Sequence, residues 1–381
     1  MPVTARAEHV GSLLRPPYLH RARDAVAVGE ITQAEFKAVE DRAVRETVAW
    51  QQAIGLPVVG DGELRRDSFQ AELTAACDGF AGVSLDAWLW GDWHSAEVGD
   101  AATPRPEGLA VVAPLRKRRN LAAEEYTFLR GCTATTGTAT TGTGTTGKVT
   151  LPSPSLFANL WSPELSAGAY PSLDGFLADV VEVLCDEVRE LVRLGCRYIQ
   201  LDAPHYPLLL DPAWRAFYEA RGWPLERWLS YGIDLDNAVI AAGRPATFGF
   251  HLCRGNQLGR WLVAGGYEPI AGPVFGRVRA DRLLLEYDDE RSGGFDPLRL
   301  VPDDKVIVLG LVTTKTSALE SAAGLTARLR QAAAVAGAHR LAVSPQCGFA
   351  TSAAGNPVTQ QAQRDKLSLL VRVAEEFFDS P

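Results

Sequence analysis

The feature that most constrains the fold of this chain is the alternation of short apolar runs with longer helical patterns. Such alternation is typical of parallel β-strands joined by crossover helices. The strand-like runs are residues 7–12, 58–63, 148–153, 198–202, 247–253, 283–287, 306–312 and 341–347. The helical patterns include residues 32–54, 174–194, 324–336 and 360–378.

Eight such units in sequence exceed the number of strands usual in an open, doubly wound sheet. A length of 381 residues also lies within the range of one barrel with insertions. We therefore predict an α/β fold in which residues 1–381 form a single (β/α)8 TIM barrel.

Residues 81–147 fall outside this rhythm, between the second and third predicted strands. Residues 81–119 are rich in Trp, Gly and Pro and predict a long excursion that serves as a lid or rim. Residues 133–147 form a low-complexity Thr/Gly/Ala tract with no apolar period, which predicts a flexible loop.

Composition excludes some classes of partner. The net charge of -8 argues against nucleic-acid binding, which needs clustered Lys and Arg. The N-terminus lacks the pattern of a signal peptide, and the chain has no run of about 18 apolar residues. We therefore predict a cytoplasmic protein with no membrane partner, whose six cysteines are reduced.

Polar residues mark the ends of the predicted strands. The carboxyl-terminal ends carry, in order, Ser12, Glu63, Ser153, Asp202, His251 with Cys253, Glu286, Thr313 and Cys347. Barrel enzymes keep their catalytic residues at this rim, so we predict the active site there.

Three of these residues favour a metal site. His251 and Cys253 lie two apart on one strand, so their side chains emerge on the same face. Imidazole nitrogen and thiolate sulfur are donors that zinc prefers, and Cys347 supplies a third from the last strand. Glu286 is a candidate for an exchangeable oxygen ligand. Taken singly, a buried Cys is usually a core residue and a strand-end Glu is often an ion-pair partner, so the metal site depends on the residues occurring together. The other four cysteines are predicted to pack in the core.

Several motifs carry a family resemblance. In order, they are HVGSLLRP, VVGDGELRRDSF, IQLDAP, FHLCRGN, LLLEYDDERSGGFDPL, VIVLGLVTTKT and LAVSPQCGFATS. Together they resemble the vitamin-B12-independent methionine synthase family, in its short single-barrel branch, which is also related to epoxyalkane:coenzyme M transferase. The resemblance covers nearly the whole chain except residues 81–147.

The resemblance implies a ligand set and a substrate. It implies that Zn2+ is held by His251, Cys253, Glu286 and Cys347. It also implies that the sulfur of homocysteine binds the zinc, while Ser12, Glu63 and Asp202 hold the amino acid part. A free thiol has a pKa of about 8.5, and metal coordination displaces its proton at neutral pH. Glu63 and Asp202 suit a substrate ammonium group, although a structural network with arginines would also explain them.

The chain departs from the family at the seventh strand. The long methionine synthases have a histidine there, where this chain has Thr313 and Thr314. Methyl transfer from an N-methyl donor needs an acid to protonate the leaving amine. We hypothesise that His205, after the fourth strand, takes this catalytic role. The alternative is a rim histidine bonded to a neighbour.

We therefore predict a zinc-dependent thiol alkyltransferase that methylates homocysteine to give methionine. The alternative is transfer of another thiol, of the coenzyme M type, to an epoxide; Arg15, Arg254, Arg291 and Lys315 would then face its sulfonate. Two further classes are a metal-free porphyrin decarboxylase and a non-catalytic metal or thiol carrier. The sequence leaves open whether the alkyl donor is a methylfolate, a methylcorrinoid or an epoxide, and it is compatible with a homo-oligomer.

Overall fold

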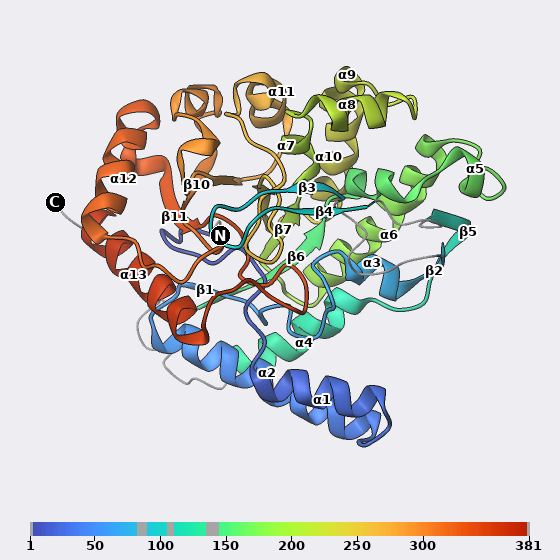
Figure 1. The fold of residues 1–381 in the computed structure, drawn as a ribbon, viewed down its shortest axis with the longest axis horizontal. Helices are drawn as coiled ribbons and strands as arrows, with labels where there is room; N and C mark the ends of the chain where they lie inside the picture. Colours follow the sequence, from blue (N-terminus) through green and yellow to red (C-terminus); the bar gives the residue numbers. More distant parts are fainter. Residues whose placement is uncertain (1–2, 82–89, 105–109, 135–144, 379–381) are drawn as a thin grey trace.

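A curled parallel sheet of seven strands forms the centre of the fold (Figure 1). The computed structural model describes residues 3–81, 90–104, 110–134 and 145–378. The strands lie in the order β1 (Val58–Val59), β6 (Thr146–Pro152), β7 (Tyr198–Asp202), β8 (Thr247–Leu252), β9 (Arg282–Glu286), β10 (Val306–Val312) and β11 (Leu341–Pro345). Each strand pairs in parallel with the strand that follows it in this order. All seven carboxyl ends therefore share one rim.

The predicted bounds are confirmed for β7 and β10. The observed bounds of β6, β8 and β9 differ from the predicted ones by at most two residues. The run 58–63 was predicted too long, because β1 ends at Val59. Gly62 and Glu63 adopt φ values of 73° and 55°, which an extended strand cannot contain. The last strand stops at Pro345, two residues before Cys347.

The first predicted strand, residues 7–12, appears in the structure as a single parallel bridge between Ala7 and Val343. The Glu8 amide donates to the Val343 carbonyl at 3.0 Å. On its other side the segment reaches the turn after β1, where the Leu13 amide donates to the Gly62 carbonyl at 3.0 Å. The segment thus lies between β11 and β1 without forming a full ladder with either.

The long helices cover the outer face of the sheet (Figure 1). They are α2 (Gln33–Ala53), α4 (Leu121–Ala134), α6 (Leu173–Arg193), α10 (Ile233–Ala242), α11 (Glu268–Arg277), α12 (Ala322–Ala336) and α13 (Gln360–Phe378). The four predicted helices agree with α2, α6, α12 and α13 to within two residues. On α6, the buried residues Leu177, Val181, Leu184 and Val188 recur at helical spacing and form the face that packs inward.

Shorter elements connect these parts. The remaining α-helices are α1 (Pro17–Ala27), α3 (Ala71–Ala76), α5 (Pro163–Ser166), α7 (His205–Leu208), α8 (Pro212–Glu219) and α9 (Leu225–Arg227). Short helical segments of other types are η2 (Pro154–Leu160), η3 (Trp228–Gly232), η4 (Glu290–Ser292), η5 (Asp296–Leu300) and η6 (Ala338–Arg340). None of the helices in the described ranges combines the length and apolarity that crossing a membrane requires.

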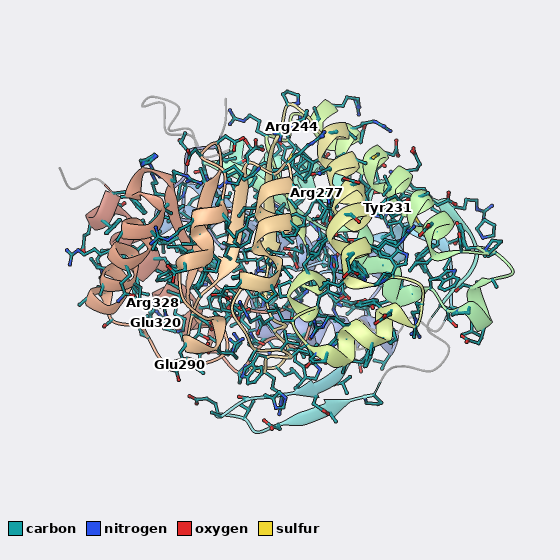
Figure 2. All side chains as sticks on the ribbon, turned by 90° about the horizontal axis from the view of Figure 1, so that it is seen from above. Tyr231, Arg244, Arg277, Glu290, Glu320 and Arg328 are labelled. Carbon is teal, nitrogen blue, oxygen red and sulfur yellow. The ribbon has the colours of Figure 1, made fainter. Side chains whose placement is uncertain are left out.

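Two small antiparallel sheets occur near or within residues 81–147. One pairs β2 (Cys77–Ala81) with β5 (Ala110–Lys117), and the other pairs β3 (Gly91–Trp93) with β4 (Ala101–Thr103). The His94 amide donates to the Trp261 carbonyl at 2.8 Å, which attaches the β3–β4 hairpin to the loop after β8. Figure 2 shows this pair of strands in pale cyan at the end of the molecule near Glu290, opposite Arg244 and Arg277. Most of the Thr/Gly tract, residues 135–144, lies outside the described residues.

A buried ion network lies inside the sheet near its amino-terminal end. The Glu8 carboxylate accepts hydrogen bonds from Lys148 Nζ at 2.9 Å, Arg282 Nη2 at 2.9 Å and the Tyr198 hydroxyl at 2.8 Å. The side chains of Glu8, Lys148 and Arg282 are at most 1% exposed. The network joins the N-terminal segment to β6, β7 and β9.

Candidate metal centre

The structure brings three predicted residues together at the carboxyl-terminal rim. His251 lies on β8, Cys253 follows that strand directly, and Cys347 follows β11. Their ligand atoms all lie within 4.8 Å of one another, and the two sulfur atoms are 3.8 Å apart. All three residues are buried. Two thiols and an imidazole at this separation can reach one metal ion.

The imidazole of His251 is held in one orientation. Its Nδ1 lies 2.9 Å from Asp202 Oδ1, and its Nε2 lies 3.3 Å from the Gln346 carbonyl oxygen, so Nε2 is the nitrogen that a metal ion would take. The same Asp202 oxygen accepts a hydrogen bond from Gln200 Nε2 at 2.7 Å, and Gln200 Oε1 accepts one from Lys148 Nζ at 2.8 Å. A carboxylate behind a ligating histidine is the usual support for a zinc site.

The charges of the three residues also suit a cation. The hydrogen bond from the Cys253 thiol lowers the pKa of Cys347 to about 5, although burial opposes the thiolate. Burial disfavours a charged imidazole, but the hydrogen bonds to Asp202 and Cys347 raise the pKa of His251 to about 10. The surroundings of His251 and Cys347 therefore favour a positive charge between them. A divalent metal ion would supply that charge. The donor set of one nitrogen and two sulfurs fits zinc.

A small, partly open pocket lies over these residues. Its lining includes six of the predicted site residues, namely Ser12, Glu63, Asp202, His251, Cys253 and Cys347. It also includes Phe69, Asn256 and Thr351, which were not predicted. The predicted substrate residues and the three metal-binding candidates thus face the same space.

Glu63 presents an unpartnered carboxylate oxygen. Its Oε1 accepts a hydrogen bond from the Thr150 hydroxyl at 2.7 Å, whereas its buried Oε2 has no hydrogen-bond partner among the described residues. Burial raises the pKa of Glu63 to about 7. A group that donates a hydrogen bond or carries positive charge would therefore find a partner here.

The structure does not bring Glu286 into the group of three. Its Oε2 accepts a hydrogen bond from the Arg254 amide at 2.6 Å, and its Oε1 lies 2.7 Å from Arg291 Nη2 and 3.4 Å from Lys315 Nζ. Although burial alone would raise the pKa of Glu286, Lys315, Arg291 and Arg254 hold it well below its usual range. Its role as a fourth metal ligand stays a prediction.

His205 lies away from the pocket. It is fully buried, its Nε2 is 2.8 Å from the Ser155 hydroxyl, and its ring packs near Tyr206 and Trp228. Burial lowers its pKa to about 3. This placement matches the interpretation of a histidine bonded to a neighbour, and the hypothesis of a catalytic acid gains no support from the geometry.

Asn256 is a pocket residue that sequence reasoning missed. Its amide donates to the Gly348 carbonyl at 2.8 Å and to the Thr314 hydroxyl at 3.1 Å. The same Thr314 hydroxyl accepts a hydrogen bond from Gln346 Nε2 at 2.9 Å. Asn256 ends the motif FHLCRGN, from which His251, Cys253 and Arg254 had been singled out. Its position three residues after Cys253 was the available signal.

The four cations predicted for a sulfonate are engaged by protein acceptors. Arg15 donates to the Glu63 carbonyl at 2.8 Å, and Arg254 donates to the Gly265 carbonyl at 2.7 Å. Arg291 and Lys315 pair with Glu286. Among the described residues, those that line the pocket include neither Arg nor Lys.

Comparison with known families gives one match to most of the chain. Residues 146–376 match the family described as the catalytic domain of cobalamin-independent synthase. The uncharacterized protein YxjH of Bacillus subtilis is 32% identical to this chain, over 97% of this chain and 94% of YxjH. The methionine synthase of Pyrococcus abyssi is 23% identical, over 89% of this chain and 85% of that protein.

Solved structures agree with this match. A Listeria monocytogenes protein assigned as a vitamin-B12 independent methionine synthase superposes with a TM-score of 0.71 at 25% identity, over 98% of both chains. A B12-independent methionine synthase from Shewanella sp. W3-18-1, in complex with selenomethionine, has a TM-score of 0.72 at 20% identity. This superposition covers 99% of this chain and 98% of the Shewanella chain. At this level of identity, the likeness is evidence for the fold only.

Proposed function

This chain belongs to the family of the cobalamin-independent synthase catalytic domain, and on that premise we propose that it is a zinc-dependent alkyltransferase that methylates homocysteine to give methionine. The observation that carries the proposal is the convergence of His251, Cys253 and Cys347 in one pocket with Glu63 and Asp202. We further propose that residues 7–12 complete an eightfold barrel. Cytoplasmic location and a homo-oligomeric state stay predictions.

His251, Cys253 and Cys347 would hold the zinc ion, with Glu286 as an exchangeable fourth ligand. When bound, zinc stabilises a substrate thiolate at neutral pH, where a free thiol of pKa about 8.5 is mostly protonated. Asp202 keeps His251 Nε2 available by holding Nδ1. The protein thereby fixes the direction from which the thiol must approach.

The substrate ammonium group would lie against Glu63 and Asp202. The free Oε2 of Glu63 supports this assignment, because a buried carboxylate oxygen without a partner is costly. The Ser12 hydroxyl lines the same pocket and would orient the amino acid part. Fixing the thiol in line with the methyl donor supplies much of the rate enhancement, since good orientation alone is worth about 7 to 11 kcal/mol.

A sulfonated thiol of the coenzyme M type is less well supported. The described lining of the pocket includes the carboxylates of Glu63 and Asp202 but no Arg or Lys, and the four nearby cations already contact protein acceptors. A sulfonate would lie beside Glu63 and Asp202 without a cation of its own. Methyl donors and epoxides should therefore be tested with homocysteine and with coenzyme M.

Metal analysis of Cys347→Ser tests the zinc site. We expect about one zinc ion per chain in the native protein and less than half of that in the variant, because a catalytic site has three or four protein ligands. Cys132→Ser is the matched control, since Cys132 lies on α4 and outside the pocket. X-ray absorption at the zinc edge should gain a sulfur ligand when homocysteine is added. Native protein with little zinc, unaffected by Cys347→Ser, would refute the proposal.

A further inference from the structure

A group of four buried charges lies beside the metal centre but outside its ligand atoms. It consists of Glu286, Asp288, Arg291 and Lys315. Lys315 Nζ lies 3.1 Å from Asp288 Oδ2 and 3.4 Å from Glu286 Oε1. Arg291 Nη2 lies 2.7 Å from Glu286 Oε1 and 3.4 Å from Asp288 Oδ1. The side chains of the two cations are 8% exposed, and those of the two acids are at most 1% exposed.

The β-sheet register brings Glu286 next to Cys253. Leu252 on β8 pairs with Leu285 on β9, so the residues that follow, Cys253 and Glu286, lie side by side. The Arg254 amide, adjacent to Cys253, donates to Glu286 Oε2 at 2.6 Å. The carboxylate of Glu286 is therefore anchored directly beside one of the two thiols that would hold a metal ion.

Both oxygens of Glu286 are engaged in the present arrangement. The Arg254 amide binds Oε2, while Arg291 and Lys315 both bind Oε1. The two cations come from separate elements: Arg291 from η4 after β9, and Lys315 from the loop after β10. Figure 2 places Glu290, the neighbour of Arg291, toward the same end of the molecule as Glu320, in the segment after β10.

We infer that Lys315 and Arg291 are positioning residues, which compete with a bound metal ion for the carboxylate of Glu286. This inference rests on the proposed function. With Glu286 held by the two cations, a bound metal ion would be open to the substrate sulfur. With Glu286 released, its carboxylate would be available as a ligand instead. The balance between the two cations and the metal ion as partners of Glu286 then determines how readily the substrate thiol binds and how tightly the metal ion is held.

Cobalt(II) is a suitable probe because its thiolate charge-transfer band and ligand-field spectrum report the ligand set directly. We expect Lys315→Met to bind Co2+ about tenfold more tightly than the native protein, since residues behind metal ligands alter affinity by about 10- to 100-fold. The spectral change on adding homocysteine should become smaller, because Glu286 stays on the metal. Lys315→Arg should restore the native values. Lys315→Met combined with Glu286→Gln should lose the gain in affinity.

Lys366→Met is the matched control. Lys366 is also a buried lysine paired with a glutamate, Glu320, but it lies on α13 and does not contact Glu286. If Lys315→Met does not fold because Asp288 keeps only its longer contact to Arg291, the double variant with Asp288→Asn removes the excess negative charge and is measured instead.

The possible results distinguish the proposed metal centre from the proposed competition for Glu286. Native cobalt affinity and a native homocysteine response in a folded Lys315→Met protein would refute the competition and leave the metal centre intact. Weaker cobalt binding would also refute it, because it would give Lys315 a merely supporting role. Absence of a thiolate charge-transfer band in the native protein would refute the metal centre itself, and the inference with it.

Discussion

At the scale of single residues, the pocket depends on two glycines that face side chains across it. A Cβ atom added at Gly11 would lie 2.4 Å from Glu63 Oε1, and one added at Gly348 would lie 2.0 Å from the Ser12 hydroxyl. Both distances are far shorter than a normal contact, so neither position tolerates a side chain without displacing a predicted substrate residue.

We expect Gly348→Ala to weaken homocysteine binding while leaving the zinc content unchanged. The added methyl group would displace Ser12, and a displacement of about 1 Å can cost on the order of 100-fold in activity. Calorimetric titration with homocysteine and metal analysis would measure the two effects separately. Gly272→Ala is the control, because no atom lies within 4 Å of its added Cβ. Native binding by Gly348→Ala would contradict the assignment of Ser12.

Asp236 carries a pH-dependent part of the stability. Its carboxyl group accepts hydrogen bonds from the Ser153 hydroxyl at 2.5 Å and the Tyr206 hydroxyl at 2.6 Å. Burial raises its pKa from 3.8 to about 7. The folded state therefore favours the protonated form, and this contribution is fully present below pH 3.8 and is lost as the pH rises through about 7.

We expect the native protein to lose on the order of 4 kcal/mol of unfolding free energy through Asp236 as the pH rises through this window. Urea unfolding between pH 4 and 8 would measure it. Asp236→Asn cannot ionise, so its curve should be flatter by this amount. Burial raises the pKa of Glu63 and Glu187 to about 7 as well, and subtracting the two curves removes their contributions. Parallel curves would contradict the prediction.

The residues that could be identified from the sequence were those whose position along a strand determines their direction. His251 and Cys253 share a face because they are two apart, and Cys347 follows a strand that ends at the same rim. The partners of Glu286 and His205 could not be predicted. Lys315 and Ser155 lie 29 and 50 residues away from them in sequence, and their contacts arise only from tertiary packing.

At the scale of elements, α2 begins with a capping box. The Thr32 hydroxyl accepts a hydrogen bond from the Glu35 amide at 3.2 Å, and Glu35 Oε2 accepts one from the Thr32 amide at 2.7 Å. This reciprocal pair satisfies two amides that the first turn of a helix leaves unpaired.

We expect Thr32→Ala to lower the free energy of unfolding by about 1 kcal/mol, because the capping hydroxyl is lost. Urea denaturation monitored by circular dichroism would measure the change. Gln33→Ala, at the first helical position beside it, should change the stability by less than about 0.5 kcal/mol. Equal effects of the two substitutions would show that the cap contributes nothing.

Helix bounds were easier to predict than strand bounds. A capping hydroxyl marks the start of α2 at Thr32 and of α13 at Thr359, whereas an apolar run does not reveal where hydrogen bonding to a neighbour stops. The run 58–63 fails as a strand because of the turn at Gly62 and Glu63. The helix α4 and the β2–β5 pair were not predicted, because α4 and β5 lie within residues 81–147, which were interpreted as an excursion outside the alternation of strands and helices.

At the scale of the whole molecule, the network around Glu8 connects the start of the chain to three strands of the sheet. Burial alone would raise the pKa of Glu8, but Lys148 and Arg282 lower it to about 2. Its contribution to stability is therefore present above its ordinary pKa of 4.5 and is lost as the pH falls through about 2.

We expect Glu8→Gln to destabilise the protein by about 3 to 5 kcal/mol, because removing one partner leaves Lys148 and Arg282 as buried, uncompensated charges. Glu190→Gln is the control, since Glu190 pairs with Arg193 at the surface and should contribute at most about 1 kcal/mol. Thermal and urea unfolding at neutral pH would compare them. A change of less than about 1 kcal/mol for Glu8→Gln would contradict the prediction.

In the series of hydrogen bonds that joins Lys148, Gln200, Asp202 and His251, the chemistry of each group determines which atom donates and which accepts. An ammonium group can only donate, so the oxygen of Gln200 must face Lys148 and its amide nitrogen must face Asp202. A carboxylate can only accept, so Asp202 requires a proton on Nδ1 of His251. Asp202 therefore selects the tautomer of the imidazole, and Lys148, near the opposite end of the sheet, selects the orientation of the Gln200 amide that supports Asp202.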